Sequence, residues 1–224
     1  MKNILLSLFM WFVFGASTLY AQAVNPTTAD FQAVGVSVAL QRVAEKEAIR
    51  VIKDPAVKEF DEPTFAKLKG GRFRNGTIEV KVLSKLLKDA PDLARGFIGI
   101  AFRINEDNSK FECIYLRPQN ARVENQLRRN RSTQYFSFPD FKFERLRKEF
   151  PGEYESYTDM GLNEWIDVRV EVRGGQAKLF INGHKQPALI VNDLKHGLEA
   201  SGAVGLWVDV GTEGYFSDLK VRNN

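Results

Sequence analysis

The stretch from residue 165 to residue 191 constrains the fold of this chain more than any other part of its sequence. Apolar residues alternate there with polar or aromatic ones: Ile166, Val168, Val170 and Val172 against Trp165, Asp167, Arg169 and Glu171. This period of two is typical of a strand with one buried face. Gly174-Gly175 and Asn182-Gly183 follow as two-residue turn signals, because such turns need positive φ angles that glycine adopts at little cost. The stretch therefore predicts an antiparallel meander that ends at Val191.

Similar strand patterns recur along the rest of the chain, separated by turn-forming residues. They cover residues 34–43, 48–52, 77–83, 97–104, 110–117, 203–210 and 215–222. A helical alternative exists for 39–53, whose Ala, Glu and Lys residues suit a helix, and 83–93 could form one helical turn. The alternation of residues 36–40 favours strands instead. Many short strands with frequent turns predict an all-β protein, a two-sheet antiparallel jelly-roll sandwich.

The first 23 residues have the pattern of a signal peptide. Ile4 to Phe14 is an apolar run broken only by Ser7, and Ala21-Gln22-Ala23 supplies the small residues that a signal peptidase needs. The run is too short for a bilayer, which takes about 20 residues. We therefore expect a signal peptide over 1–23, a single mature domain over 24–224, a secreted or periplasmic location, and no stable membrane insertion after cleavage.

The charge balance and the small number of His and Cys residues exclude several functional classes. The 32 Lys and Arg residues against 28 Asp and Glu give a net charge of +4, which gives no reason to expect a nucleic-acid partner. Two His and one Cys are too few for a His/Cys metal site. The loop 105–109 could hold calcium, but it lacks the 12-residue EF-hand pattern, so a plain turn is the better interpretation. We expect no metal and no cofactor.

Two predicted strands carry small residues on the face opposite their apolar side. These residues are Gly99, Ala101 and Arg103 in 97–104, and Ala203, Gly205, Trp207 and Asp209 in 203–210. Small residues leave room above a sheet, and Arg, Trp and Asp suit contacts with a ligand there. Two interpretations stay open. The face is either a ligand groove in which Trp207 offers a platform to a sugar ring, or a floor covered by another segment of the chain.

The connection 118–159 is far longer than the usual 4–6 residues, and such connections are often functional. It interleaves basic and aromatic residues: Arg122, Arg128, Arg129, Arg131, Arg145 and Arg147 with Tyr135, Phe136, Phe138, Phe141, Phe143, Tyr154 and Tyr157. Such a mixture could bind single-stranded nucleic acid, but the balanced charge and expected export favour sugar rings and hydroxyl groups. The alternative is a satellite core with arginines paired to neighbouring glutamates.

Several segments of the chain are characteristic of a known protein group. They are Tyr115 to Arg122, Gln134-Tyr135, Tyr154 to Tyr157, Val191 to Gly197, Gly205 to Val208 and Gly214 to Val221. These segments resemble secreted bacterial proteins with the concanavalin A-like lectin/glucanase fold, related to the 3-keto-disaccharide hydrolase-like and laminin-G-like domains. The resemblance covers most of residues 31–222. It implies a two-sheet jelly roll whose concave sheet holds a carbohydrate.

The sequence lacks the motifs of well-known hydrolases. It contains neither the Glu-x-Asp-x-x-Glu strand of family-16 glycoside hydrolases nor a Gly-x-Ser-x-Gly elbow. Glu153 and Glu155 would lie roughly 6.6 Å apart along an extended segment, beyond the roughly 5–5.5 Å of retaining glycosidases. Glu112, Glu164 or Asp209 could meet them in space. Two acids in a loop are more often solvated than catalytic, so the catalytic residues stay unassigned.

Two function classes follow. The first is an exported carbohydrate-active protein that hydrolyses glycosidic bonds; the alternative is a non-catalytic carbohydrate-binding or adhesion module, and a structural envelope protein is a weaker third. Two carboxylates that converge beside Trp207 and Arg117, at least one of them desolvated, would favour the hydrolase. The residues expected to bind the saccharide are Arg103, Tyr115, Arg117, Asn120, Arg122, Gln134, Tyr135, Glu155, Tyr157, Trp207 and Asp209.

Overall fold

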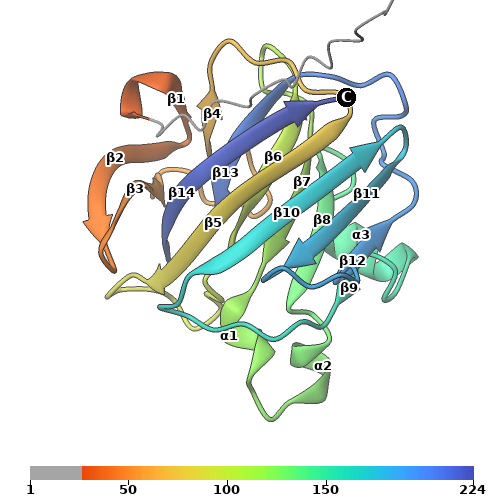
Figure 1. Ribbon diagram of the computed structural model, residues 1–224. Helices are drawn as coiled ribbons and strands as arrows, with labels where there is room; N and C mark the ends of the chain where they lie inside the picture. Colours follow the sequence, from red (N-terminus) through yellow and green to blue (C-terminus); the bar gives the residue numbers. More distant parts are fainter. Residues whose placement is uncertain (1–26) are drawn as a thin grey trace, which may run out of the picture.

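A computed structural model describes residues 27–224 as two antiparallel sheets packed face to face (Figure 1). Sheet A has the strand order β1(Phe31–Val34), β4(Phe65–Leu68), β13(Ala203–Val208), β6(Ile98–Ile104), β7(Phe111–Leu116), β8(Thr133–Phe138) and β9(Glu155–Ser156). Sheet B has the order β12(Leu189–Val191), β11(Gln176–Ile181), β10(Ile166–Arg173), β5(Gly76–Leu86), β14(Thr212–Asn223), β3(Lys46–Lys53) and β2(Val36–Val43). The all-β jelly-roll prediction is confirmed. The predicted signal peptide, 1–23, lies outside the described residues.

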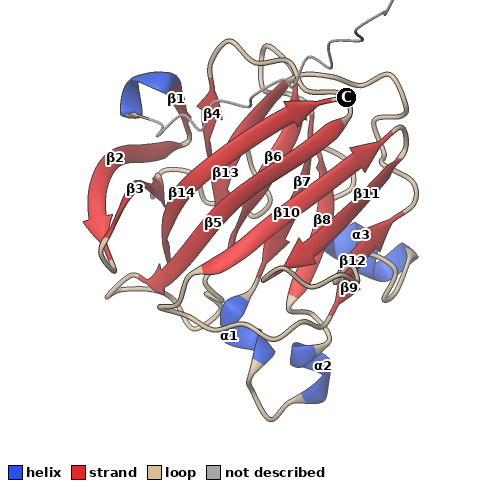
Figure 2. Ribbon diagram, viewed as in Figure 1, coloured by secondary structure: helices blue, strands red, loops and turns tan. Residues whose placement is uncertain are grey.

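Among residues 27–224, helical structure is confined to short segments, which Figure 2 shows in blue. They are η1(Thr28–Asp30), α1(Pro118–Ala121), α2(Gln126–Arg129) and α3(Phe143–Glu149). Within residues 27–224 no helix is long and apolar enough to cross a membrane. The helical alternative for 39–53 is wrong: β2 and β3 form a hairpin that turns through Ala44 and Glu45, both with positive φ. The helical turn considered for 83–93 is also wrong: β5 continues to Leu86, and the residues after it form hydrogen-bonded turns and no helix.

The meander predicted from residues 165–191 is confirmed. β10 pairs with β11, which pairs with β12, and Val170 lies opposite Leu179. Gly174 turns the first hairpin with a φ of 55°. Asn182 and Gly183 take φ values of 50° and 71° in the second turn, the left-handed region that two-residue hairpin turns require.

The connection 118–159 is more ordered than the prediction of a long loop. It contributes α1, α2 and α3, and it also contributes β8 and β9 to sheet A. β8 carries polar residues at buried positions, among them Thr133, Gln134 and Ser137. Its sequence therefore lacks the apolar alternation that reveals a half-buried strand, which is why the pattern missed it.

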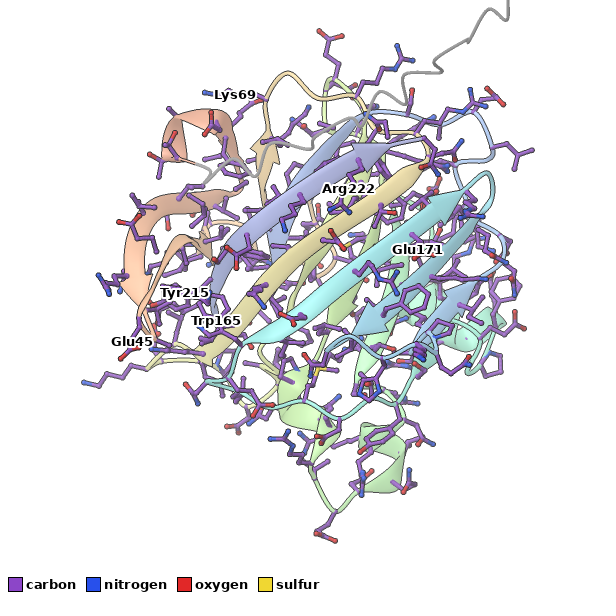
Figure 3. The ribbon with its side chains drawn as sticks, viewed as in Figure 1. Glu45, Lys69, Trp165, Glu171, Tyr215 and Arg222 are labelled. Atoms are coloured by element: carbon purple, nitrogen blue, oxygen red, sulfur yellow. The ribbon has the colours of Figure 1, made fainter. Side chains whose placement is uncertain are left out.

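The two sheets differ in what covers their outer faces. Along β10, buried and more exposed residues alternate, and the outward side carries charges such as Asp167, Glu171 and Arg173. Figure 3 shows Glu171 and Arg222 on this open face of sheet B. In β6, β7 and β13 of sheet A, by contrast, every residue is buried. Sheet A is therefore covered on both faces.

One face of sheet A packs on sheet B, and residues 54–64, which we call the cover segment, lie over the other. Val208 points toward sheet B, because a Cβ added to Gly214 of β14 would lie 2.5 Å from its Cγ1. On the opposite face, the indole Nε1 of Trp207 donates a hydrogen bond of 3.0 Å to the Glu62 carbonyl. Thr64 also donates to the Val208 carbonyl, at 2.6 Å. Of the two interpretations of this face, the structure shows the covered floor at Trp207.

Candidate functional site

A cavity of about 330 Å³ lies on the outer face of sheet A, at the end that the cover segment leaves open. It is lined by Phe60, Asp61, Leu93, Arg95, Phe97, Tyr115, Arg117, Arg128, Arg131, Phe143, Arg147 and Asp209. We call it the arginine pocket. Three further hollows, at the edge and open face of sheet B and near the C-terminus, have no buried charged side chain in their lining.

The strand register brings the floor of the arginine pocket together. Ile98 of β6 lies opposite Leu116 of β7 and opposite Val208 of β13. The next residues beyond this row, Phe97, Arg117 and Asp209, therefore meet at one end of three adjacent strands. α3 and the end of α2 add Phe143, Arg147 and Arg128 from the connection 118–159.

Arg117 is the most firmly held charge of the pocket, with a residue exposure of 5%. Its Nη1 donates to Glu155 Oε1 at 3.1 Å, and its Nη2 donates to the Tyr115 hydroxyl at 2.5 Å and to Gln134 Oε1 at 2.9 Å. The guanidinium is therefore fixed in one orientation before any ligand arrives, which lowers the entropy lost on binding.

Glu155 anchors three of the arginines. Besides Arg117, its carboxylate pairs with Arg131 at 3.4 Å and with Arg147. Burial acts to raise the pKa of Glu155, but the hydrogen bonds and charges of Arg147 and Arg117 hold that pKa below its usual value. Glu155 is thus an ionised anchor. Glu153, which could have formed a carboxylate pair with it, is exposed.

A different pair of acids, Asp61 and Asp209, converges in the pocket. The carboxylate of Asp209 accepts a 2.5 Å hydrogen bond from Lys53 Nζ and a 3.0 Å one from the backbone N–H of Asp61. Asp61 is 1% exposed, and its Oδ2 accepts a 2.7 Å hydrogen bond from the Phe143 N–H. Burial raises the pKa of Asp61 to about 7, assisted by the negative charge of Asp209 and opposed by the Phe143 N–H. Asp61 therefore exchanges a proton near neutral pH.

Arg95 and Arg128 have only neutral partners among the described residues. Nη1 of Arg95 donates to the carbonyls of Asp92 and Ala94, at 2.5 and 2.6 Å. Nη2 of Arg128 donates to Asn120 Oδ1 at 3.3 Å. The pKa of Arg95 is lowered by burial and by the like charges of Arg128 and Arg117. The charge of Asp92 acts in the opposite direction on Arg95, but within residues 27–224 no carboxylate forms an ion pair with either guanidinium.

Aromatic rings form the walls between these charges. The Phe60 and Phe143 rings meet edge to face with centroids 6.2 Å apart. The guanidinium of Arg147 lies 5.1 Å from the centre of the Phe143 ring, and that of Arg117 lies 6.0 Å from the Phe97 ring. Flat apolar surfaces beside fixed hydrogen-bond donors suit a ligand with an apolar ring face and polar edges, such as a sugar.

The structure brings part of the predicted site together. Tyr115, Arg117 and Asp209 line the arginine pocket, and Asn120, Gln134 and Glu155 hold its arginines in place. Trp207 lies beside the pocket, in one register row with Gly99 and Tyr115, and is 0% exposed because the cover segment lies on it. The expectation that Trp207 is an open platform for a sugar ring is therefore wrong in this structure. Its ring packs instead against Tyr115, a lining residue of the pocket, at a centroid distance of 4.8 Å.

The other four predicted residues lie away from the pocket. Arg103 occupies the far end of β6, about 20 Å from Phe97 by strand rise, and donates to the carbonyls of Arg74, Gly174 and Gly197. Tyr135 donates to the buried carboxylate of Glu112. Arg122 and Tyr157 are on the surface: Arg122 pairs with Asp159 and Glu164, and Tyr157 accepts a hydrogen bond from Arg129.

Sequence reasoning missed five lining residues of the pocket, which are Phe60, Asp61, Leu93, Arg95 and Phe97. The first two lie between Asp54-Pro55 and Glu62-Pro63, and the residue before a proline favours extended backbone. That pattern, with the length of the connection between β3 and β4, marks the cover segment as a candidate functional loop. Nothing in the sequence around Arg95 distinguishes it from other surface arginines.

The loop 105–109, where a calcium ion was considered, forms a turn around a lysine. Lys67 Nζ donates to the Asn105 carbonyl at 2.9 Å, the Glu106 carbonyl at 3.0 Å and Asn108 Oδ1 at 2.7 Å. An ammonium group thus lies where these oxygens converge. Across residues 27–224, no group of three or more His, Cys, Asp or Glu side chains is arranged to hold a metal ion.

Comparisons with known proteins give similarity in structure only. No protein-family model matches the sequence, and no curated protein matches it either. A carbohydrate binding module from Bacillus subtilis is 13% identical, with 85% of this chain and 97% of that one aligned and a TM-score of 0.53. A protein of unknown function with a galectin-like fold, also from Bacillus subtilis, is 11% identical over 92% and 95% of the two chains, with a TM-score of 0.54. A predicted glycosyl hydrolase from Parabacteroides distasonis is 11% identical over 88% and 90%, with a TM-score of 0.50. At these identities the likeness is one of fold: the chain has the jelly-roll architecture that these proteins share.

Proposed function

We propose that the protein binds a saccharide in the arginine pocket. The observation that carries the proposal is the combination of a guanidinium fixed by Glu155, Tyr115 and Gln134 with the aromatic walls of Phe60 and Phe143. The planar guanidinium donates hydrogen bonds to sugar hydroxyl groups in fixed directions. The aromatic ring faces pack against the apolar side of a sugar, and both surfaces lose their bound water. The same fold is found in a structure described as a carbohydrate binding module, which supports the proposal. Export to the periplasm or medium stays a prediction from the sequence.

Binding to a glycan array, followed by titration calorimetry on the strongest sugar, tests this proposal. Phe60→Ala removes one aromatic wall, and we expect it to weaken binding roughly fivefold to tenfold, about 1 kcal/mol. Phe180→Ala is the matched control, because Phe180 lies against Arg169 on sheet B, away from the arginine pocket. Thermal melting checks that both variants fold. The proposal fails if no sugar binds, or if both substitutions weaken binding equally.

One observation favours hydrolysis as a second candidate function. Asp61 is a desolvated acid with a pKa of about 7, and its hydrogen-bonded neighbour Asp209 lines the same pocket together with Arg117. A protonated Asp61 could donate its proton to a glycosidic oxygen at neutral pH, which is the role of a general acid. Asp209, held by Lys53, would contribute a fixed negative charge.

Release of reducing sugar from each bound saccharide separates the two candidates. A hydrolase should release product, lose at least a hundredfold in rate in Asp61→Asn, and show a pH–rate limb near 7. Saccharides that are recovered intact from the parent protein would make it a binding module. In that case Asp61→Asn should bind the same sugars, and these should again be recovered intact.

A further inference from the structure

The charge of the arginine pocket indicates which class of saccharide it takes. Resting on the proposed saccharide binding, we propose that the ligand is an acidic saccharide, in which a carboxylate or sulfate group on the sugar is held by Arg95 and Arg128. Five arginines line a cavity of about 330 Å³, a volume at the low end for small-molecule sites. A cavity of this size suits one or two sugar residues rather than the length of a polymer.

The carboxylates of the pocket do not neutralise its arginines. Arg117, Arg131 and Arg147 share the single carboxylate of Glu155. Asp209 is committed to Lys53, with N–O at 2.5 Å. Asp61 is the remaining acid, and burial keeps a large fraction of it uncharged at neutral pH, since its pKa is about 7.

Arg95 and Arg128 are the two groups left for a ligand. Neither takes part in an ion pair within residues 27–224, and both reach the pocket from outside sheet A, Arg95 from the β5–β6 connection and Arg128 from α2. Both donate their hydrogen bonds to neutral oxygens. Arg95 donates to the carbonyls of Asp92 and Ala94, and Arg128 donates to the side-chain amide oxygen of Asn120. The positive charge of Arg128 lowers the pKa of Arg95, and an anion held by both guanidinium groups would relieve this repulsion.

The walls of the pocket distinguish an acidic sugar from a simple anion. Phe60, Phe97 and Phe143 line the same cavity, so part of any ligand must lie against apolar rings. Inorganic sulfate offers no such surface. A sugar ring with one acidic substituent satisfies both halves of the pocket, because its ring contacts the aromatic walls and its carboxylate or sulfate accepts paired guanidinium hydrogen bonds.

The test compares acidic saccharides with their neutral counterparts, using protein expressed from the full-length sequence. The panel pairs glucuronate with glucose, galacturonate with galactose, and sulfated with unsulfated oligosaccharides of the same backbone. We expect at least a tenfold preference for the acidic member of the best-bound pair, decreasing as the salt concentration rises. Preference confined to carboxylates, or confined to sulfates, supports the inference and identifies the group.

Two double variants assign the preference to the pocket. Arg95→Gln with Arg128→Gln should reduce the acidic preference to below threefold, because binding of the acidic member falls much more than binding of its neutral partner. Arg42→Gln with Arg173→Gln removes the same two charges from exposed positions on sheet B and should keep the preference. If the first double variant has a lower melting temperature than the parent, Arg128→Gln alone replaces it in the comparison. This single variant should keep the fold, because Arg128 lies on the short surface helix α2.

Three results would overturn the inference. Equal binding of neutral and acidic partners would remove it and leave saccharide binding intact. Equal loss of preference in both double variants would show that overall charge, not the pocket, attracts the ligand. Equal competition by inorganic sulfate or by a single-stranded oligonucleotide would show recognition of charge alone. Failure of every sugar to bind would instead refute the proposed function itself.

Discussion

Replacement of Asp61 by Asn tests the electrostatics of the pocket without any knowledge of its ligand. Asp61 is 1% exposed, and its Oδ2 accepts the Phe143 N–H at 2.7 Å. The side-chain oxygen of Asn can accept the same hydrogen bond, so the substitution removes the ionisable group and keeps the local geometry. The cover segment should therefore stay in place over Trp207.

The pH dependence of this variant follows from the pKa of about 7 that burial gives Asp61 in the folded protein, against 3.8 for the free group. Between these values the folded protein keeps a proton that the unfolded chain has released. The Asp61 contribution to the free energy of unfolding is therefore largest at low pH, falls as the pH rises toward 7, and is constant above it. Each pH unit between 5 and 7 is worth about 1.4 kcal/mol. Between pH 5 and pH 8, the free energy of unfolding of Asp61→Asn should therefore rise by about 3 kcal/mol relative to that of the parent protein.

Urea denaturation of parent and variant at five pH values from 5 to 9 measures this difference directly. Asp140→Asn, which removes a carboxylate from an exposed position, controls for the loss of one negative charge. The reasoning is refuted if the Asp61→Asn and parent curves run parallel across the whole range. Such a result would mean that water reaches Asp61 and that its carboxyl is not desolvated.

Three further predictions concern the core, the anchor and the N-terminus. Trp207→Ala should lower the free energy of unfolding by about 3–5 kcal/mol, because it leaves a cavity beneath the cover segment; a variant as stable as the parent in urea would place the ring at the surface. Arg117→Gln leaves Glu155 with fewer partners and should cost about 2–3 kcal/mol, whereas no measurable loss would show that the ion pair is not buried. Mass spectrometry of exported protein should find a start at Gln22 or Val24, and an intact Met1 would contradict the predicted signal peptide.

The alternating strands and hairpin turns could be predicted because their determinants are local. Val168 and Val170 mark a buried face, and Asn182-Gly183 marks a turn, from neighbours a few residues away. β8 could not be found in this way, since Thr133 and Gln134 are buried polar residues whose hydrogen-bond partners lie in other strands and loops. Strand prediction fails where side-chain hydrogen bonds replace apolar packing.

The site could be predicted only in part, because only its local determinants can be recognised in the sequence. Strand parity correctly placed Trp207 opposite the apolar face of β13, but it could not show what lies above the ring. The answer comes from Glu62, 145 residues away in the sequence. Asp61 resembles any loop aspartate until the cover segment folds over β13, and only then does burial raise its pKa. Contacts of this kind depend on the whole topology.

The double covering of sheet A determines which positions of this chain are free to diverge. On β10, every second residue faces solvent and can be substituted at little cost in stability. The sequence of sheet B can therefore diverge on its open side. In β6, β7 and β13 each residue is enclosed, and a change on either face disturbs a packed neighbour. A descendant that acquires a new ligand preference would therefore do so through substitutions and insertions in residues 54–64 and 118–159, while the strands beneath them stay almost unchanged.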